Sequence, residues 1–282
     1  MAISASMVRE LREATGAAMM DCKKALEATG GDLDASIDHL RKQGLKSAAK
    51  KSGRETAEGR TFAVLSEDAR RGHLVAVACE TDFLSKGEDF KDFMGQLETH
   101  VAEHDPKSVD DLMAQSWQGG DQTVAARVQE AVGHFGENIQ VVHLARLENP
   151  NGLVGAYVHH DYKQGAIASV TTSADAATGA GPLRSLCQHI TVFSPAYANT
   201  DSVPAEDAAR EEAVLRESDD MKSKPAEVQD KMIVGRMKKF YAERCLSEQA
   251  WMLDDKQTVT KALASALGGD VKVEAFSLIK LG

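Results

Sequence analysis

Apolar residues near the N-terminus recur at helical spacing and are separated by residues that end helices. The pattern predicts a first helix that ends at Gly16 and a second over residues 19–29. A third helix begins at a capping Asp32 and ends at Gly44. These helices predict a small domain over residues 1–45. Its core is marginal by size alone, so we expect it to gain stability by docking onto something else.

The next segment, residues 46–60, is rich in Lys, Ala, Ser and Gly and has almost no large apolar side chains. We expect a linker that carries a cluster of basic side chains, namely Lys46, Lys50, Lys51 and Arg54. The composition favours a solvated linker. Contact of this cluster with an acidic surface of another protein is the alternative interpretation.

From residue 61 onward, strand-like and helix-like patterns alternate and then repeat. The first set has strands at 61–65, 74–79 and 139–147 and helices around 90–101 and 124–132. The second has strands at 153–160, 166–172 and 271–279 and helices around 183–193 and 258–267. Both sets close with a helix followed by Gly-x-Asn/Asp-Ile/Val-Gln/Lys-Val. We therefore predict an α+β fold with two related core subdomains in tandem, residues 61–148 and 149–282.

A helical insertion interrupts the second core subdomain at residues 204–245. Its first arm, 204–221, holds seven acidic and two basic residues, and its second arm, 226–244, holds three acidic and five basic residues. The opposite charge bias of the arms predicts an antiparallel helical hairpin that pairs with itself. A solvated structural excursion and a contact with a partner or a second copy both remain open.

The composition, the charge and the N-terminus argue against a nucleic-acid-binding, membrane or secreted protein. The 282 residues include 33 basic and 43 acidic side chains, and the net charge of −10 argues against direct binding of nucleic acid. The strongly apolar run at 74–79 is too short to cross a bilayer. The N-terminus has neither the basic start nor the apolar stretch of a signal peptide. We expect a cytoplasmic protein without membrane contact.

The sequence contains no strong catalytic or metal-binding motif. A Walker-type phosphate loop, a Gly-x-Ser-x-Gly elbow and a His-Glu-x-x-His helix are all missing. His159 and His160 are adjacent at the end of a predicted strand, where their side chains point to opposite faces and chelate one ion poorly. The cysteines form no Cys-x-x-Cys pair, which favours free buried thiols: Cys22, Cys79, Cys187 and Cys245. We expect no enzyme activity, no cofactor and no metal.

Three stretches of the chain resemble one known family. Residues 11–26 read LREATGAAMMDCKKAL, residues 80–86 read ETDFLSK, and residues 235–240 read GRMKKF. In order and spacing they resemble the bacterial elongation factor Ts family over nearly the whole chain. The resemblance implies a three-helix domain of the ubiquitin-associated type, a core of two α+β subdomains and an inserted helical hairpin. It also implies a partner, the GTPase elongation factor Tu, and a task, which is to accelerate the release of GDP so that GTP can bind.

The resemblance further implies roles for particular residues. Phe83 would insert as a wedge between side chains of the nucleotide-binding domain of elongation factor Tu and would disturb the groups that order its Mg²⁺ site. The wedge comprises Thr81, Asp82, Phe83 and Leu84. Positions that would grip the GTPase are Met19, Met20, Lys23 and Lys51. A homodimer or a 2:2 complex with the partner is left open.

Other interpretations compete with the wedge. From the residues alone, Asp82 would cap the following helix and Phe83 would be buried at its start. A scaffold that uses the three-helix domain to bind other proteins, without exchange activity, is the rival function. The chain also departs from the family pattern. Leu84 and Ser85 stand where the family commonly has Val and Ala, and the chain stops at Gly282, so we expect the C-terminal helical module of some members to be missing.

Overall fold

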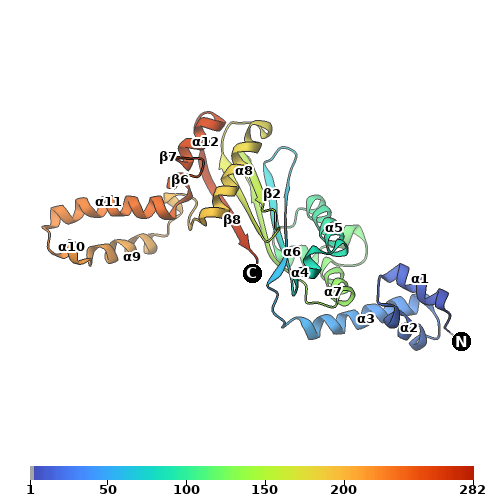
Figure 1. Ribbon diagram of the computed structural model, residues 1–282. Helices are drawn as coiled ribbons and strands as arrows, with labels where there is room; N and C mark the ends of the chain where they lie inside the picture. The colour runs from blue at the N-terminus through green and yellow to red at the C-terminus, as the bar shows by residue number, and fades with distance from the viewer. Residues whose placement is uncertain (1–2) are drawn as a thin grey trace. The chain divides into compact units, whose positions relative to one another are not determined.

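The computed structural model describes residues 3–282, apart from the side chains of residues 45–49, and combines helices with small sheets (Figure 1). Two compact units divide the chain. One contains the chain up to Phe62 together with Val75–Leu144 and Lys280–Gly282, and the other contains Ala63–Leu74 and Ala145–Ile279. The predicted α+β class is confirmed.

The N-terminal residues fold as the predicted three-helix domain, with helices α1 (Ala5–Thr15), α2 (Met19–Ala28) and α3 (Leu33–Lys51). Gly16 ends α1 in the left-handed conformation, with φ of 65°. Asp32 caps α3, since its carboxylate accepts the backbone N–H of Ala35 at 2.9 Å. The fully buried side chains of the small core come from α1 and α2, namely Val8, Leu11, Cys22, Ala25 and Leu26, and partly buried side chains of α3 pack against them, namely Leu33, Ile37 and Leu40.

Helix α3 is longer than predicted, because it continues past Gly44 to Lys51. The expectation that it ends at Gly44 was wrong, and the first part of the predicted linker is helical. Gly44 lies where α3 packs against α7 (Val124–Phe135): a Cβ added to Gly133 of α7 would come within 3.0 Å of the Gly44 Cα. Close packing between helices offsets the low helix propensity of glycine here. The side chain of Lys46, part of the predicted basic cluster, lies outside the described residues.

The first sheet joins three strands in the order β1-β2-β3. These are β1 (Glu58–Leu65), β2 (Arg71–Cys79) and β3 (Gln140–Glu148). The central strand β2 is buried along nearly its whole length, which explains its continuous apolar run. The chain between β2 and β3 forms α4 (Asp82–Lys86), α5 (Glu88–His104), α6 (Val109–Ala114), a 3-10 turn (Trp117–Gly119) and α7. The helix predicted around residues 90–101 is α5, and its apolar residues, including Phe90 and Leu97, are buried.

The second sheet has the order β4-β5-β8, with β4 (Gly152–Val158), β5 (Gln164–Thr171) and β8 (Lys272–Lys280). Strands β4 and β5 are antiparallel. Helix α8 (Ala176–Phe193) lies so close to β4 that a Cβ on Gly155 would come within 2.3 Å of the Leu183 Cβ. Only glycine permits this approach. The unit also holds α12 (Val259–Leu267), and the small pair β6 (Ala250–Trp251) and β7 (Asp254–Thr258), which lacks the alternating pattern of a predictable strand.

The predicted helical hairpin is present and interrupts the second sheet's unit. It consists of α9 (Ala205–Arg216), α10 (Asp219–Lys222) and α11 (Ala226–Arg244), and Figure 1 shows α11 running beside the other two. Ion pairs join the arms: Arg216 lies 3.0 Å from Asp230, and Arg236 pairs with Asp220. Short 3-10 turns lie directly before and directly after the hairpin in the sequence, at Thr200–Ser202 and Leu246–Glu248.

A shared polar group supports the repeat that the sequence predicts. In the first half, the Nε2 of His100 lies 3.1 Å from the Oε1 of Gln115, and its ring stacks on Trp117 at 5.3 Å between centroids. The second half has the same group. The Nε2 of His189 lies 3.0 Å from the Oε1 of Gln249, and the ring of His189 stacks on Trp251 at 5.4 Å between centroids. In each half the Gln lies shortly before a helix capped by a threonine, α7 or α12. The halves therefore share local packing as well as the order of their elements.

Candidate functional site

The turn that carries the predicted wedge lies between β2 and α5, and it forms the one-turn helix α4. Thr81 is the N-cap, because its hydroxyl accepts the backbone N–H of Leu84 at 3.2 Å. The expectation from the residues alone, that Asp82 is the cap, was therefore wrong. Asp82 is the first residue of α4, and its carboxylate lies 2.7 Å from the Nζ of Lys86. That hydrogen bond lowers the pKa of Asp82 and helps to keep it charged.

The turn displays the side chain of Phe83 to solvent. Its side chain is 86% exposed, although it is a large apolar group. The alternative in which Phe83 is buried at the start of the helix was wrong. The neighbouring Leu84 is half-buried and Ser85 is buried, so α4 keeps one side on the protein and turns the ring outward.

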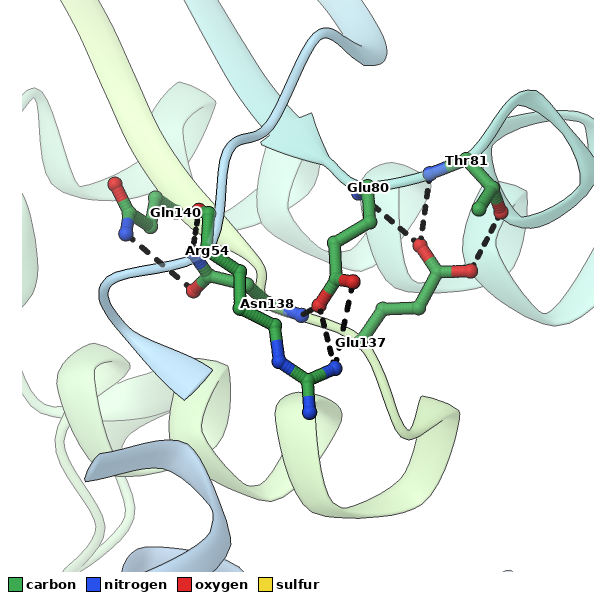
Figure 2. A network of polar contacts seen from close by, with 6 residues as sticks. All are labelled: Arg54, Glu80, Thr81, Glu137, Asn138 and Gln140. Carbon is green, nitrogen blue, oxygen red and sulfur yellow. Dashed lines mark hydrogen bonds and ion pairs between the residues drawn. The ribbon is translucent and has the colours of Figure 1, made fainter. Parts of the chain in front are cut away.

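A carboxylate from a distant loop holds the start of the turn. Figure 2 shows Glu137, from the loop between α7 and β3, directed at the backbone of Glu80 and Thr81. Its Oε2 accepts the N–H of Thr81 at 2.9 Å and the N–H of Glu80 at 3.1 Å. Its Oε1 accepts the hydroxyl of Thr81 at 2.5 Å. Hydrogen bonds to a carboxylate are stronger than those between neutral groups, so this loop fixes the turn firmly.

The side chain of Glu80 makes the reciprocal contact with the same loop. Its Oε1 accepts the backbone N–H of Asn138 at 2.6 Å and lies 3.3 Å from the Nη1 of Arg54 (Figure 2). Asn138 in turn donates its side-chain N–H to the carbonyl of Arg54 at 2.8 Å, and Gln140 donates to the carbonyl of Ser52 at 3.1 Å. The segment after α3 is thus tied to the loop that holds residues 80–86, the wedge turn.

The turn also contacts a buried thiol. The thiol of Cys79, the last residue of β2, donates to the carbonyl of Thr81 at 3.3 Å. Burial, and to a smaller extent the charge of Glu137, raises the pKa of Cys79 to about 12. This thiol is therefore protonated at neutral pH and serves as a packed hydrogen-bond donor rather than a nucleophile.

The predicted N-terminal contact residues lie on separate elements. Met19 and Met20 are in the first turn of α2 and are 54% and 61% exposed, while Cys22 faces the core. Lys23 lies one turn after Met19 and 3.9 Å from Glu27. Lys51 is half-buried in the last turn of α3. The structure thus leaves both methionines accessible and groups them with Lys23 on one short helix.

Sequence reasoning missed the residues that hold the wedge turn, chiefly Glu80, Glu137 and Asn138. One signal was present in the repeated motif. Where the first half has Glu137, the second half has Gly269, which has no side chain. A carboxylate that breaks an internal repeat is a candidate for a role specific to one half.

The described residues offer little else for chemistry. Among residues 3–282, no group of three or more His, Cys, Asp or Glu side chains is arranged to hold a metal ion. No helix in this part of the chain is long and apolar enough to cross a membrane. The turn with its exposed ring is the best-defined candidate site.

Comparisons with known proteins identify the family. A family model described as Elongation factor TS matches residues 80–282. The chain belongs to the elongation factor Ts family. Proteins named Elongation factor Ts from Magnetococcus marinus and Hydrogenovibrio crunogenus are each 39% identical to it, over 100% of this chain and 93% and 92% of theirs. One from Symbiobacterium thermophilum is 39% identical, over 97% of this chain and 90% of its own.

The matched ranges include the residues of the candidate site. The match to the elongation factor Ts model begins at Glu80, so it includes the wedge turn and Glu137 but not the N-terminal helices. The alignment with the Magnetococcus protein spans the whole chain and covers those helices as well. The resemblance stated from the motifs is therefore confirmed.

Proposed function

We propose that this elongation factor Ts family member is a guanine-nucleotide exchange factor. It binds elongation factor Tu in its GDP form, disturbs the Mg²⁺ site of that GTPase and promotes GDP release so that GTP can bind. The observation that carries the proposal is the ring of Phe83, 86% exposed on a turn that hydrogen bonds hold in place.

The physics of the turn suits insertion into another protein. An aromatic ring exposed to water gains about 2 kcal/mol when it is buried in an apolar pocket. Because the turn is already fixed by Glu137, little conformational entropy is lost when the ring docks. Asp82 lies beside the ring and keeps its charge.

Exchange follows from competition between two ligands of the GTPase. A GTPase holds GDP through phosphate contacts and a bridging Mg²⁺. A factor that binds best when nucleotide and Mg²⁺ are absent weakens nucleotide binding. By thermodynamic linkage, nucleotide weakens the binding of the factor by the same free energy. Phe83 and Asp82 act on the groups that order the Mg²⁺ site, and no covalent bond is formed or broken. In this proposal the chain is not an enzyme.

The N-terminal domain supplies a second contact in the same proposal. Met19 and Met20 offer adaptable apolar side chains, with Lys23 one turn away. Lys51 adds a basic group at the end of α3. The proposal includes action in the cytoplasm, without a cofactor or direct contact with nucleic acid. It is the same for a homodimer and for a 2:2 complex with elongation factor Tu.

Release of a fluorescent GDP analogue from elongation factor Tu tests the proposal. The wild-type chain should accelerate release, and the double variant Asp82→Ala with Phe83→Ala should reduce this acceleration at least about tenfold. The fold should survive, because Phe83 is exposed. Leu253→Ala, which removes an exposed apolar group from the turn between β6 and β7, is the matched control and should leave release unchanged. Full acceleration by a folded double variant would refute the wedge.

A further inference from the structure

The wedge turn is too short to be stable by itself. Helix α4 has five residues, and a single helical turn is unstable in isolation because nucleation is unfavourable. Phe83 contributes little packing, since its ring is exposed. At the far end of α4, the carbonyl of Ser85 accepts a hydrogen bond from the Nη1 of Arg60 at 3.3 Å. The start of the turn, from which the ring projects, therefore depends on contacts from elsewhere.

Those contacts converge on Glu137. Its two carboxylate oxygens receive the backbone N–H groups of Glu80 and Thr81 and the hydroxyl of Thr81, at distances from 2.5 to 3.1 Å. The hydroxyl of Thr81 has one proton. Because that proton is donated to Glu137, the oxygen lone pairs remain free to accept the N–H of Leu84. The carboxylate thus orients the cap of α4 as well as the strand end before it.

We infer that Glu137 is the positioning residue of the wedge, and that its carboxylate sets the direction in which Phe83 leaves the protein. This inference rests on the proposed function, because it names the group that aims the proposed wedge. Glu137 acts through Thr81 on Phe83. It orients the ring without being required to touch the partner.

The position of Glu137 is itself well determined. Gly136 ends α7 in the left-handed conformation with φ of 79°, which turns the chain toward the end of β2. On the other side, the N–H of Asn138 is held by the carboxylate of Glu80 at 2.6 Å. The two segments therefore hold each other by contacts in both directions, and the loop cannot shift without moving the turn.

Comparison of the two halves of the chain separates this role from a general structural one. The related motif of the second half has Gly269 at the position of Glu137. The strand β8 and helix α12 of that half form without a carboxylate at this position. The fold of the repeat does not require Glu137, which fits a role specific to the half that carries Phe83.

Amide hydrogen exchange in the free protein tests the positioning directly. Glu137→Ala should accelerate exchange of residues 80–86 about tenfold, with a smaller effect on exchange in the rest of the protein. Glu137→Gln should stay within about threefold of wild type, since its carbonyl oxygen can still accept the backbone N–H groups. Glu148→Ala, an exposed carboxylate at the end of β3, is the control. Unchanged exchange in Glu137→Ala would overturn the inference.

A double-mutant cycle on GDP release tests whether the role acts through the ring. Glu137→Ala should reduce the stimulated release from elongation factor Tu about tenfold, and Glu137→Gln should largely restore it. In a chain that already carries Phe83→Ala, the further loss should be small, because there is no ring left to aim. Equal losses in both backgrounds would overturn the inference. If wild type gave no stimulation, the proposed function would fail, and the exchange measurements would decide the positioning role by themselves.

Discussion

The Oε2 of Glu137 lies 2.9 Å from the backbone nitrogen of Thr81, although 56 residues separate them in the sequence. This hydrogen bond joins the loop after α7 to the end of β2. It fixes a one-turn helix that displays an aromatic ring to solvent. Rigidity and exposure seldom coincide, because the packing that fixes an apolar side chain normally buries it. Here polar contacts to the backbone replace that packing.

Thr81 provides a first test of this arrangement. Thr81→Val keeps the shape of the side chain but removes the hydroxyl that caps α4 and contacts Glu137. We expect the free energy of unfolding to fall by about 1 kcal/mol and stimulated GDP release to fall about tenfold. Urea denaturation and the release assay measure the two effects. Thr81→Ser retains the hydroxyl and should behave like wild type, and an impaired Thr81→Ser would contradict this explanation.

The close approach of α3 and α7 predicts opposite outcomes for two glycines. A Cβ on Gly133 would lie 3.0 Å from the Gly44 Cα, whereas a Cβ on Gly44 would have its nearest neighbour at 3.9 Å. Gly133→Ala forces the helices apart and should destabilise the protein by about 1 kcal/mol. Gly44→Ala fits the space, improves helix propensity and should stabilise it by about 0.5 kcal/mol. Thermal denaturation of both variants measures these changes in stability. If both variants were stabilised, or both destabilised, the helices would not pack as described.

The cysteines should be protected from alkylation in the folded state. Cys22, Cys79, Cys187 and Cys245 are all buried. Burial raises the pKa of Cys79 to about 12 and that of Cys245 to about 11, so thiolate is scarce at pH 8. Mass spectrometry after iodoacetamide treatment should find none modified in the native protein and all of them modified in guanidinium chloride. Rapid native labelling of Cys79 would show that the turn above it opens readily.

The buried histidines predict a loss of stability in mild acid. Burial lowers the pKa of His189 below its ordinary value of 6.5, against a raising effect of the Gln249 contact, and burial likewise lowers that of His100. Below pH 6.5 the unfolded chain therefore binds protons that the folded chain does not. The free energy of unfolding therefore keeps its full value above about pH 6.5. It declines as the pH falls below that value, by up to about 1.4 kcal/mol per pH unit for each histidine.

Urea denaturation between pH 7.5 and 5.5 measures this decline. Carboxylates whose pKa is lowered, such as Asp82, titrate below this window and do not contribute to it. His189→Gln should reduce the slope of stability against pH, because the variant side chain does not titrate. The same slope in wild type and variant would rule out His189 as its source.

Helix signals in the sequence were reliable where local chemistry decides the structure. Gly16 and Asp32 limit their helices as their residue types predict. The same reasoning failed at Gly44, since a glycine that normally ends a helix lies inside α3, at the point where Gly133 of α7 packs closely against it. The pair β6 and β7 was missed because its residues are mostly polar and exposed.

The site could be predicted only in part. The motif around Phe83 identified the turn, but the residues alone favoured a buried ring, because large apolar side chains are usually buried. The contact with Glu137 lies far along the chain, and no spacing rule connects residues at such a distance. Its only trace in the sequence was a glutamate where the repeat has Gly269.

The sequence by itself determined the class of fold, the main helices and strands, the internal repeat and the hairpin, because period, caps and charge bias act over a few residues. It also carried the motifs of the elongation factor Ts family. Only the tertiary structure decided that Phe83 faces solvent and that Glu137 and Thr81 meet. Both depend on how the loop after α7 returns to the end of β2, and hydrogen bonds between distant segments form only when the whole unit has packed.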